Sequence, residues 1–352
     1  MSIFLKFPRK SLFIVFLLFI SLPADAATCV GIDTLPGSKE RFERGKCFEL
    51  QKDAVVKENF LIGGNFIIKS GVKLRVESGR KITVKRGGNL NVRGELVIAE
   101  KGKLLLELMS SSSVQGSLLI RNDASVEMQK SATLKSLGRF TMYPHATLSL
   151  NDNSKLSVSG NATFDNALMI MKGGAFENVG TVKFTSGTRV MGSKNAVISN
   201  RGHLIFNKGS AVELSGSSQL SNRRNIELLG KFHTNDTSSF VNYGFFELAS
   251  GGEYEMQGGS SLLNQHVMEI KGIFSMSSHT LFENRNGFKI YETGLFELKG
   301  ASRCVNRGSI YNAGGMSNTD EAVFDNKKSY FDVRDEKSLP QTSGTYHQTG
   351  GI

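Results

Sequence analysis

Residues 200–222 read NRGHLIFNKGSAVELSGSSQLSN. This stretch decides the fold because it spans one repeat, from Asn200 to the next equivalent asparagine, Asn222. That asparagine recurs through the second half of the chain at intervals of 20 or 22 residues, at Asn178, Asn200, Asn222, Asn242, Asn264, Asn284, Asn306 and Asn326. A period of this length, repeated many times, is typical of a solenoid in which one structural unit stacks on the next.

Each unit contains three short segments in which apolar and polar residues alternate. In the quoted unit they are residues 203–206, 211–214 and 218–221, and Gly and Ser separate them. A period of two indicates a β-strand, since a helix would place its apolar residues three and four apart. We therefore predict an all-β protein, a right-handed parallel β-helix of about 12–13 rungs with 20–22 residues and three short strands per rung.

The register of the repeat can be followed from residue 72 onward. The third residue of every unit is apolar, from Leu74 in the first unit to Tyr330 in the last, partial unit. Proline is also nearly excluded, because Pro144 is the only one between Pro36 and Pro340. A missing N–H is costly inside a stacked hydrogen-bond ladder, so this scarcity fits the same fold.

The recurring asparagine has a structural explanation. Stacked asparagine side chains can hydrogen-bond to one another along a solenoid, so we expect a ladder rather than a catalytic site. Two residues after the asparagine stands Gly180, Gly202, Gly244 or Gly308 in half of the units, which predicts a turn with positive φ. Two residues before it the column is apolar and includes Cys304, which we expect to be a buried, unpaired thiol.

The chain divides into four expected segments. Residues 1–26 have a positive start, an apolar core and an Ala24-Asp-Ala26 ending, which predicts a secretory signal peptide cleaved after Ala26. Residues 27–59 are expected to cap the solenoid, 60–332 to form the β-helix, and 333–352 to be an irregular tail. No later apolar stretch is long enough to span a bilayer, and export favours a disulfide between Cys29 and Cys47.

The chain is basic, with a formal net charge of +11, and many of its cations lie between residues 69 and 93. They suggest a polyanion-binding patch for lipopolysaccharide or acidic glycan; the alternative is that they only keep the sheet surface soluble. Nucleic acid is not an expected partner, because the protein is exported and no aromatic residues alternate with the cations. The candidate binding residues are Lys73, Arg75, Arg80, Lys81, Lys85 and Arg86.

A second candidate site is a column of glutamates. Glu227, Glu247 and Glu269 occupy the same outward position of successive units, about 5 Å apart, which resembles the carboxylate spacing of retaining glycosidases. The alternative is a solvated stripe in which Lys289 relieves the repulsion. The histidines lack metal-binding spacing and no phosphate-binding loop occurs, so neither a metal site nor a cofactor is expected.

The repeats also carry a family resemblance. Residues 200–209, NRGHLIFNKG, and 242–251, NYGFFELASG, resemble the β-helical passenger repeats of exported Gram-negative surface proteins, namely autotransporters and filamentous-haemagglutinin-like adhesins. The resemblance covers residues 60–332 and implies a cell-surface or secreted protein, most often an adhesin or a toxin.

Three functions therefore stay open. The first is a non-enzymatic adhesin that binds host matrix or acidic glycan. The second is a polysaccharide-active enzyme on a pectate-lyase-like scaffold. The third is a structural envelope protein, which would be retained in the periplasm.

Overall fold

The computed structural model describes residues 29–35, 44–327, 331–333, 341–342 and 345–348. The predicted signal peptide, residues 1–26, lies outside them. Over the described residues the backbone forms strands and turns, and none of it is a helix long and apolar enough to cross a membrane.

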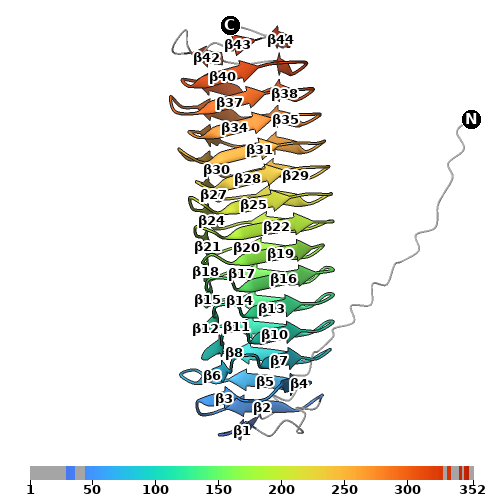
Figure 1. Cartoon of the computed structure of the whole chain (residues 1–352), viewed down its shortest axis with the longest axis vertical. Helices are drawn as coiled ribbons and strands as arrows, with labels where there is room; N and C mark the ends of the chain where they lie inside the picture. The colour runs from blue at the N-terminus through green and yellow to red at the C-terminus, as the bar shows by residue number, and fades with distance from the viewer. Residues whose placement is uncertain (1–28, 36–43, 328–330, 334–340, 343–344, 349–352) are drawn as a thin grey trace, which may run out of the picture.

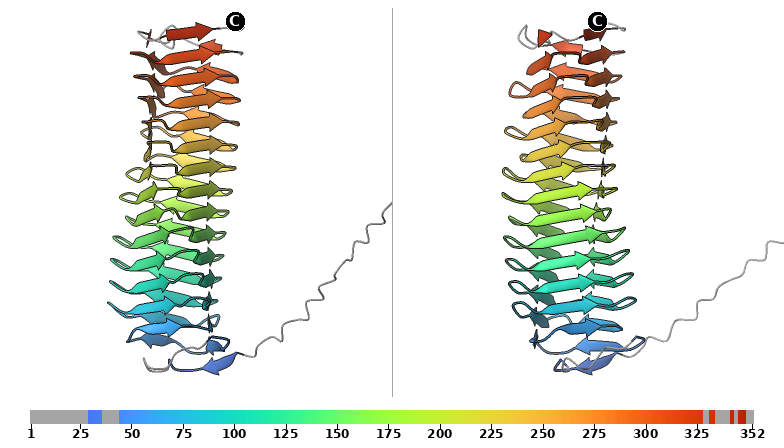
Figure 2. Two further views of the ribbon diagram at one scale, coloured as in Figure 1. Left: turned by 90° about the vertical axis from the view of Figure 1, so that its right-hand side faces the viewer. Right: turned by 45° about the vertical axis from the view of Figure 1, so that its right-hand side comes forward.

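The strands stack into a straight rod in which each coil lies on the one before it (Figures 1 and 2). Three long sheets run the length of the rod, with 16, 14 and 14 strands, and neighbouring strands within each sheet are parallel. Each strand pairs with the equivalent strand of the next coil, so three strands make one turn. The predicted parallel β-helix with three strands per rung is confirmed.

We name the sheets A, B and C. Sheet A consists of β1 (Val30–Ile32), β2 (Cys47–Leu50), β5 (Asn65–Ile68), β8 (Asn89–Val92), β11 (Ser111–Val114), β14 (Thr133–Ser136), β17 (Lys155–Val158), β20 (Ala175–Asn178), β23 (Val197–Asn200), β26 (Gln219–Asn222), β29 (Ser239–Asn242), β32 (Ser261–Asn264), β35 (Leu281–Asn284), β38 (Arg303–Asn306), β41 (Val323–Asn326) and β44 (Thr345–Gln348). Sheet B consists of β4 (Phe60–Ile62), β7 (Lys81–Val84), β10 (Lys103–Leu106), β13 (Ser125–Met128), β16 (Thr147–Asn151), β19 (Leu168–Lys172), β22 (Arg189–Ser193), β25 (Ala211–Leu214), β28 (Lys231–Thr234), β31 (Glu253–Met256), β34 (Ile273–Met276), β37 (Leu295–Leu298), β40 (Gly315–Asn318) and β43 (Gln341–Thr342). Sheet C consists of β3 (Ala54–Val56), β6 (Lys73–Val76), β9 (Glu95–Ile98), β12 (Ser117–Ile120), β15 (Arg139–Met142), β18 (Asn161–Phe164), β21 (Thr181–Phe184), β24 (His203–Phe206), β27 (Asn225–Leu228), β30 (Phe245–Leu248), β33 (Met268–Ile270), β36 (Gly287–Ile290), β39 (Ser309–Asn312) and β42 (Phe331–Val333).

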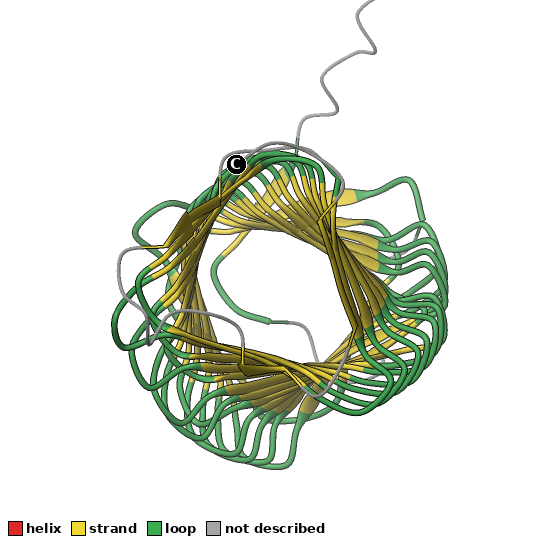
Figure 3. Ribbon diagram, turned by 90° about the horizontal axis from the view of Figure 1, so that it is seen from above, coloured by secondary structure: helices red, strands yellow, loops and turns green. Residues whose placement is uncertain are grey.

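The register keeps apolar side chains inside the coil throughout. Leu204 pairs with Ile226 and both are buried, whereas the neighbouring pair, Ile205 and Glu227, points outward. A slip of one residue would turn every buried side chain of a strand to the outside, so burial fixes the register. Seen along the axis, the sheets enclose one continuous core and the turns project at the corners (Figure 3).

The two ends differ from the sequence-based expectation. The first strands of all three sheets, β1 to β4, begin before or at the predicted start of the solenoid, so the cap segment adds strands of its own. At the other end Phe331, not Tyr330, pairs with Ile310, which shifts the last unit by one residue. Strands β43 and β44 lie in the predicted irregular tail and extend sheets B and A, so the tail prediction is wrong for these residues. An open sheet edge offers backbone donors and acceptors to an extended segment whatever its side-chain pattern.

The asparagine column forms a continuous ladder inside the turn that follows sheet A. The Nδ2 of Asn200 donates to Oδ1 of Asn222 at 2.8 Å and to the backbone carbonyl of Asn225 at 2.8 Å, while its Oδ1 accepts from the N–H of Gly202 at 3.2 Å. All eight side chains are fully buried. Seven such Nδ2–Oδ1 bonds, each 2.8 Å, join Asn178, Asn200, Asn222, Asn242, Asn264, Asn284, Asn306 and Asn326 in order.

The glycines two residues after these asparagines are needed for a reason other than the predicted one. None of Gly180, Gly202, Gly244 and Gly308 has a positive φ. A Cβ at Gly202 would instead lie 2.1 Å from the carbonyl oxygen of Gly180 in the preceding coil, and at the other three the nearest carbonyl oxygen lies between 1.9 and 2.2 Å. The turn therefore needs glycine because successive backbones approach closely.

Both cysteine predictions have a structural counterpart. Cys29 and Cys47 form a disulfide that ties the chain just before β1 to β2, which pairs with β1. Cys304 is a buried free thiol in β38. Burial raises the pKa of the Cys304 thiol well above its ordinary value, and the nearby Asp325 raises it further.

Replacing one ladder residue should destabilise the rod measurably. Asn242→Ala removes the acceptor of Asn222 and leaves the buried Oδ1 of Asn264 without its donor, while the carbonyl of Val267 loses its side-chain donor and keeps the N–H of Phe246, so we expect a loss of about 2–3 kcal/mol. The midpoint of guanidinium denaturation measures this loss. Asn225→Ala, at an exposed position in β27, is the control. Equal midpoints for the two variants would show that the ladder contributes nothing beyond packing.

Thiol titration checks the cysteine assignments. The folded, unreduced protein should react with no Ellman's reagent, because Cys304 is buried and its pKa is raised. Denaturation without reductant should release one thiol per chain, and denaturation with reductant all three. Three reactive thiols before reduction would contradict the disulfide.

Candidate functional site

The structure separates the six cations that the sequence grouped together. Lys73 and Arg75 point outward from β6 on sheet C, while Lys81 lies on β7 of sheet B. The other three occupy the turns before and after β7, namely Arg80, Lys85 and Arg86. The set therefore winds around one coil and does not form a single patch. Of the six, Lys73 and Arg75 line the same groove.

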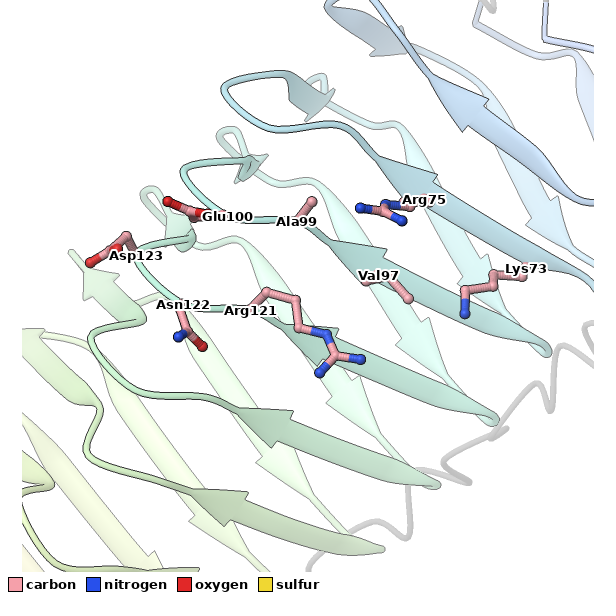
Figure 4. A pocket seen from close by; sticks show the side chains of 8 residues that line it. All are labelled: Lys73, Arg75, Val97, Ala99, Glu100, Arg121, Asn122 and Asp123. Carbon is pink, nitrogen blue, oxygen red and sulfur yellow. The ribbon is translucent and has the colours of Figure 1, made fainter.

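That groove lies on sheet C and has a volume of about 540 Å³. Figure 4 shows the guanidinium groups of Arg75 and Arg121 over the strands and the carboxylates of Glu100 and Asp123 at the turns. The residues that line the groove are Lys73, Arg75, Val97, Ala99, Glu100, Arg121, Asn122 and Asp123.

The two arginines of the groove are available to bind an anion. Lys73 is already paired with Glu95, at 2.8 Å. Neither Arg75 nor Arg121 has an ion-pair partner among the residues that the structure describes, and both are exposed. Arg121 lies 4.3 Å from the centroid of the Tyr143 ring, which holds its guanidinium plane against an aromatic face. Two uncompensated guanidinium groups thus share one groove.

Sequence reasoning missed Arg121. It stands in the turn after β12, two coils beyond β6, and was outside the window of residues 69–93 in which the cations are dense. The repeat itself carried the missing signal. Counting units of 22 residues places Arg121 on the same sheet edge as Glu77 and Ala99, and therefore close in space to Arg75.

The glutamate column forms as the repeat predicts, but two of its three carboxylates, those of Glu247 and Glu269, are paired with lysines. Glu227, Glu247 and Glu269 are in register on neighbouring strands of sheet C. Lys271 Nζ lies 2.6 Å from Glu247 Oε1 and 3.9 Å from Glu269 Oε2, and Lys289 Nζ lies 3.3 Å from Glu269 Oε1. This arrangement favours the solvated stripe, with Lys271 as the counter-ion that the sequence analysis did not single out.

Two ionisable groups beside this column, Lys271 and Tyr291, have pKa values that are shifted away from neutral pH. The hydrogen bond to Glu247 raises the pKa of Lys271, and burial together with Glu269 raises the pKa of Tyr291. Both shifts move the pKa of the group further from neutral pH. A catalytic acid or base works best with a pKa near the operating pH. Elsewhere in the described part of the chain, no three His, Cys, Asp or Glu side chains gather closely enough to hold a metal ion.

Comparison with known proteins supports the fold alone. No protein-family model matches the chain, and no curated protein matches it by sequence. Among solved structures it is similar to the TibA55-350 fragment, crystallised in the hyper-glycosylated form produced by TibC. The two share 13% identity with a TM-score of 0.50, over 88% of this chain and 98% of the TibA fragment.

A double-mutant cycle tests whether Lys271 is a structural counter-ion. Lys271→Met leaves Glu247 and Glu269 on adjacent strands without the ammonium between them, and should cost about 1 kcal/mol of unfolding free energy. Adding Glu247→Gln should recover most of this loss because it removes the repulsion. Lys208→Met, an exposed lysine in a turn, should have no effect. Additive losses in the double variant would contradict the pairing.

Proposed function

We propose that the protein is an exported, non-enzymatic surface-binding protein that uses the groove on sheet C to bind acidic glycan. The observation that carries this proposal is the pair of unpaired guanidinium groups, Arg75 and Arg121, beside the apolar side chains of Val97 and Ala99. Guanidinium groups bind carboxylate and sulfate with paired hydrogen bonds, and apolar side chains can pack against the C–H face of a sugar ring.

Two carboxylates at the edge of the groove favour a glycan over other polyanions as the ligand. Glu100 and Asp123 line the same groove as the two arginines. Their carboxylates would repel a phosphate backbone, yet they accept hydrogen bonds from hydroxyl groups. A ligand rich in hydroxyls that also carries a negative charge uses both halves of the groove. Acidic sugars have this combination.

The proposal that the protein is exported rests on the predicted signal peptide and on the fold. The chain shares its solenoid with the TibA fragment, and its repeats resemble autotransporter and filamentous-haemagglutinin-like passengers. The ligand would then be met at the cell surface or in the medium. Host matrix glycans and bacterial lipopolysaccharide both carry suitable acidic sugars, and binding to such a surface would make the protein an adhesin.

Neutralising the two arginines should weaken glycan binding. For Arg75→Ala/Arg121→Ala we expect at least about a tenfold loss of affinity for heparin or polygalacturonate in calorimetry, because charged hydrogen bonds contribute about 1.5–3 kcal/mol when buried and less when exposed. Wild-type binding should also weaken with added salt.

The chain offers a matched control. Arg223→Ala/Arg224→Ala removes the same charge from exposed positions, and it too removes an arginine that stacks on a tyrosine, Tyr243 at 5.1 Å. This variant should bind as the wild type does. If both double variants lose affinity equally, the interaction is a general effect of net charge and the groove is not the site. Cleavage of the polysaccharide during the assay would favour the enzyme alternative.

A further inference from the structure

We propose that the ligand is a linear acidic polysaccharide that lies along the solenoid axis on sheet C, with successive sugar units on successive coils from β6 to β21. This inference rests on the proposed function and adds the shape, the direction and the length of the bound glycan.

Unpaired cations continue along sheet C beyond the groove. After Arg75 on β6 and Arg121 beyond β12 come Arg139 on β15 and Lys183 on β21. All four are exposed, and within the described residues none of them has an ion-pair partner. Arg139 is held over the sheet because its Nε donates to Thr141 Oγ1 at 3.2 Å. The cations therefore form a strip that crosses several coils, with Arg75 and Lys183 in one outward column, Arg139 in the next column and Arg121 in the turn.

An uncharged run of residues lies between Arg75 and Lys183, in the same outward column as these two cations. Val97, Leu119, Thr141 and Thr163 follow one another in register at the outward position of β9, β12, β15 and β18. The first three point outward yet are only 5%, 7% and 6% exposed, so the longer side chains around them stand above them. We call this low, uncharged stretch with Arg75 at one end and Lys183 at the other the trough; Arg139 stands beside it in the neighbouring column.

The coil spacing suits a chain of sugars. Parallel strands lie about 4.8 Å apart, so the five steps from β6 to β21 span about 24 Å. One pyranose unit of an extended polysaccharide advances by a similar length. A glycan laid along the axis would therefore meet the same kind of surface at each unit, whereas a glycan laid across the coils would leave the trough after one or two units.

The strip ends where the charge of the sheet changes. Beyond Lys183 the outward column continues with Ile205 and then with Glu227, the most exposed of the three glutamates, which lies 3.9 Å from His203. A polyanion that reached this point would be repelled. The bound segment should therefore be limited to about six sugar units, one for each strand from β6 to β21.

A length series of oligouronates, from disaccharide to decasaccharide, tests the binding mode. Measured by calorimetry, affinity should rise with length to about the hexasaccharide and then level off. Lys183→Ala should lower the affinity for the hexasaccharide about fivefold and leave the disaccharide unaffected. Lys135→Ala, an exposed lysine on β14 of sheet A, is the control and should change neither. Glu227→Gln should raise affinity for the decasaccharide only.

The outcomes separate the two proposals. Absence of binding at every length would refute the acidic-glycan function itself. Binding that is lost in Arg75→Ala/Arg121→Ala but is independent of length and of Lys183 would keep the groove and overturn the axial mode. Binding to detergent-dispersed lipopolysaccharide without binding to oligouronates would also overturn it, in favour of a compact phosphorylated ligand.

Discussion

The backbone of each coil must satisfy its hydrogen-bonding groups with the coils above and below it, and the rest of the structure depends on this in-register stacking. The constraint keeps proline out of nearly the whole rod and forces glycine where carbonyl oxygens approach too closely for a Cβ. At the turn after sheet A the asparagine side chains add to this hydrogen bonding. The Asn200 side chain donates to the carbonyl of Asn225 and to the next asparagine, so the ladder links successive coils through side chains as well as backbones.

The same stacking determines how a surface can be built. Every side chain lies directly above the equivalent residue of the previous coil, so a surface is a set of columns, and one substitution per unit is enough to change its charge along the axis. Sheet C illustrates this. Its first half carries, among the described residues, cations without ion-pair partners at both ends of a low, uncharged run, and its second half carries Glu247 and Glu269 paired with lysines. A ligand that repeats along its own length fits such a surface better than a compact one.

How much could be predicted from the sequence follows from the same geometry. The apolar alternation and the asparagine period were sufficient for the fold, the strand register from Leu74 onward and the burial of Cys304, because each of these depends on neighbouring coils with the same pattern. The prediction was wrong at Gly202 and its equivalents, since a close approach between two coils leaves the same residue preference as a positive φ. It was also wrong in the tail, where β43 and β44 pair through their backbones without the repeat pattern.

The candidate site was the least predictable part. Density of charge along the chain selected six cations that the coil distributes around its circumference, whereas the groove combines Arg75 with Arg121 from two coils further on. Lys271 was missed in the same way. Its partner Glu247 belongs to the preceding unit, and its partner Glu269 occupies another position of the same unit. On a solenoid, the neighbours of a charged residue are found by looking one period before and one period after it in the sequence, because those residues lie on the adjacent coils.

A crystal structure of the protein with a uronate hexasaccharide would test the central claim most directly. We expect the sugar chain along sheet C between β6 and β21, with its carboxylates against Arg75, Arg121 and Lys183. A hexasaccharide bound across the coils, on sheet A or B, or over the glutamate column would contradict it.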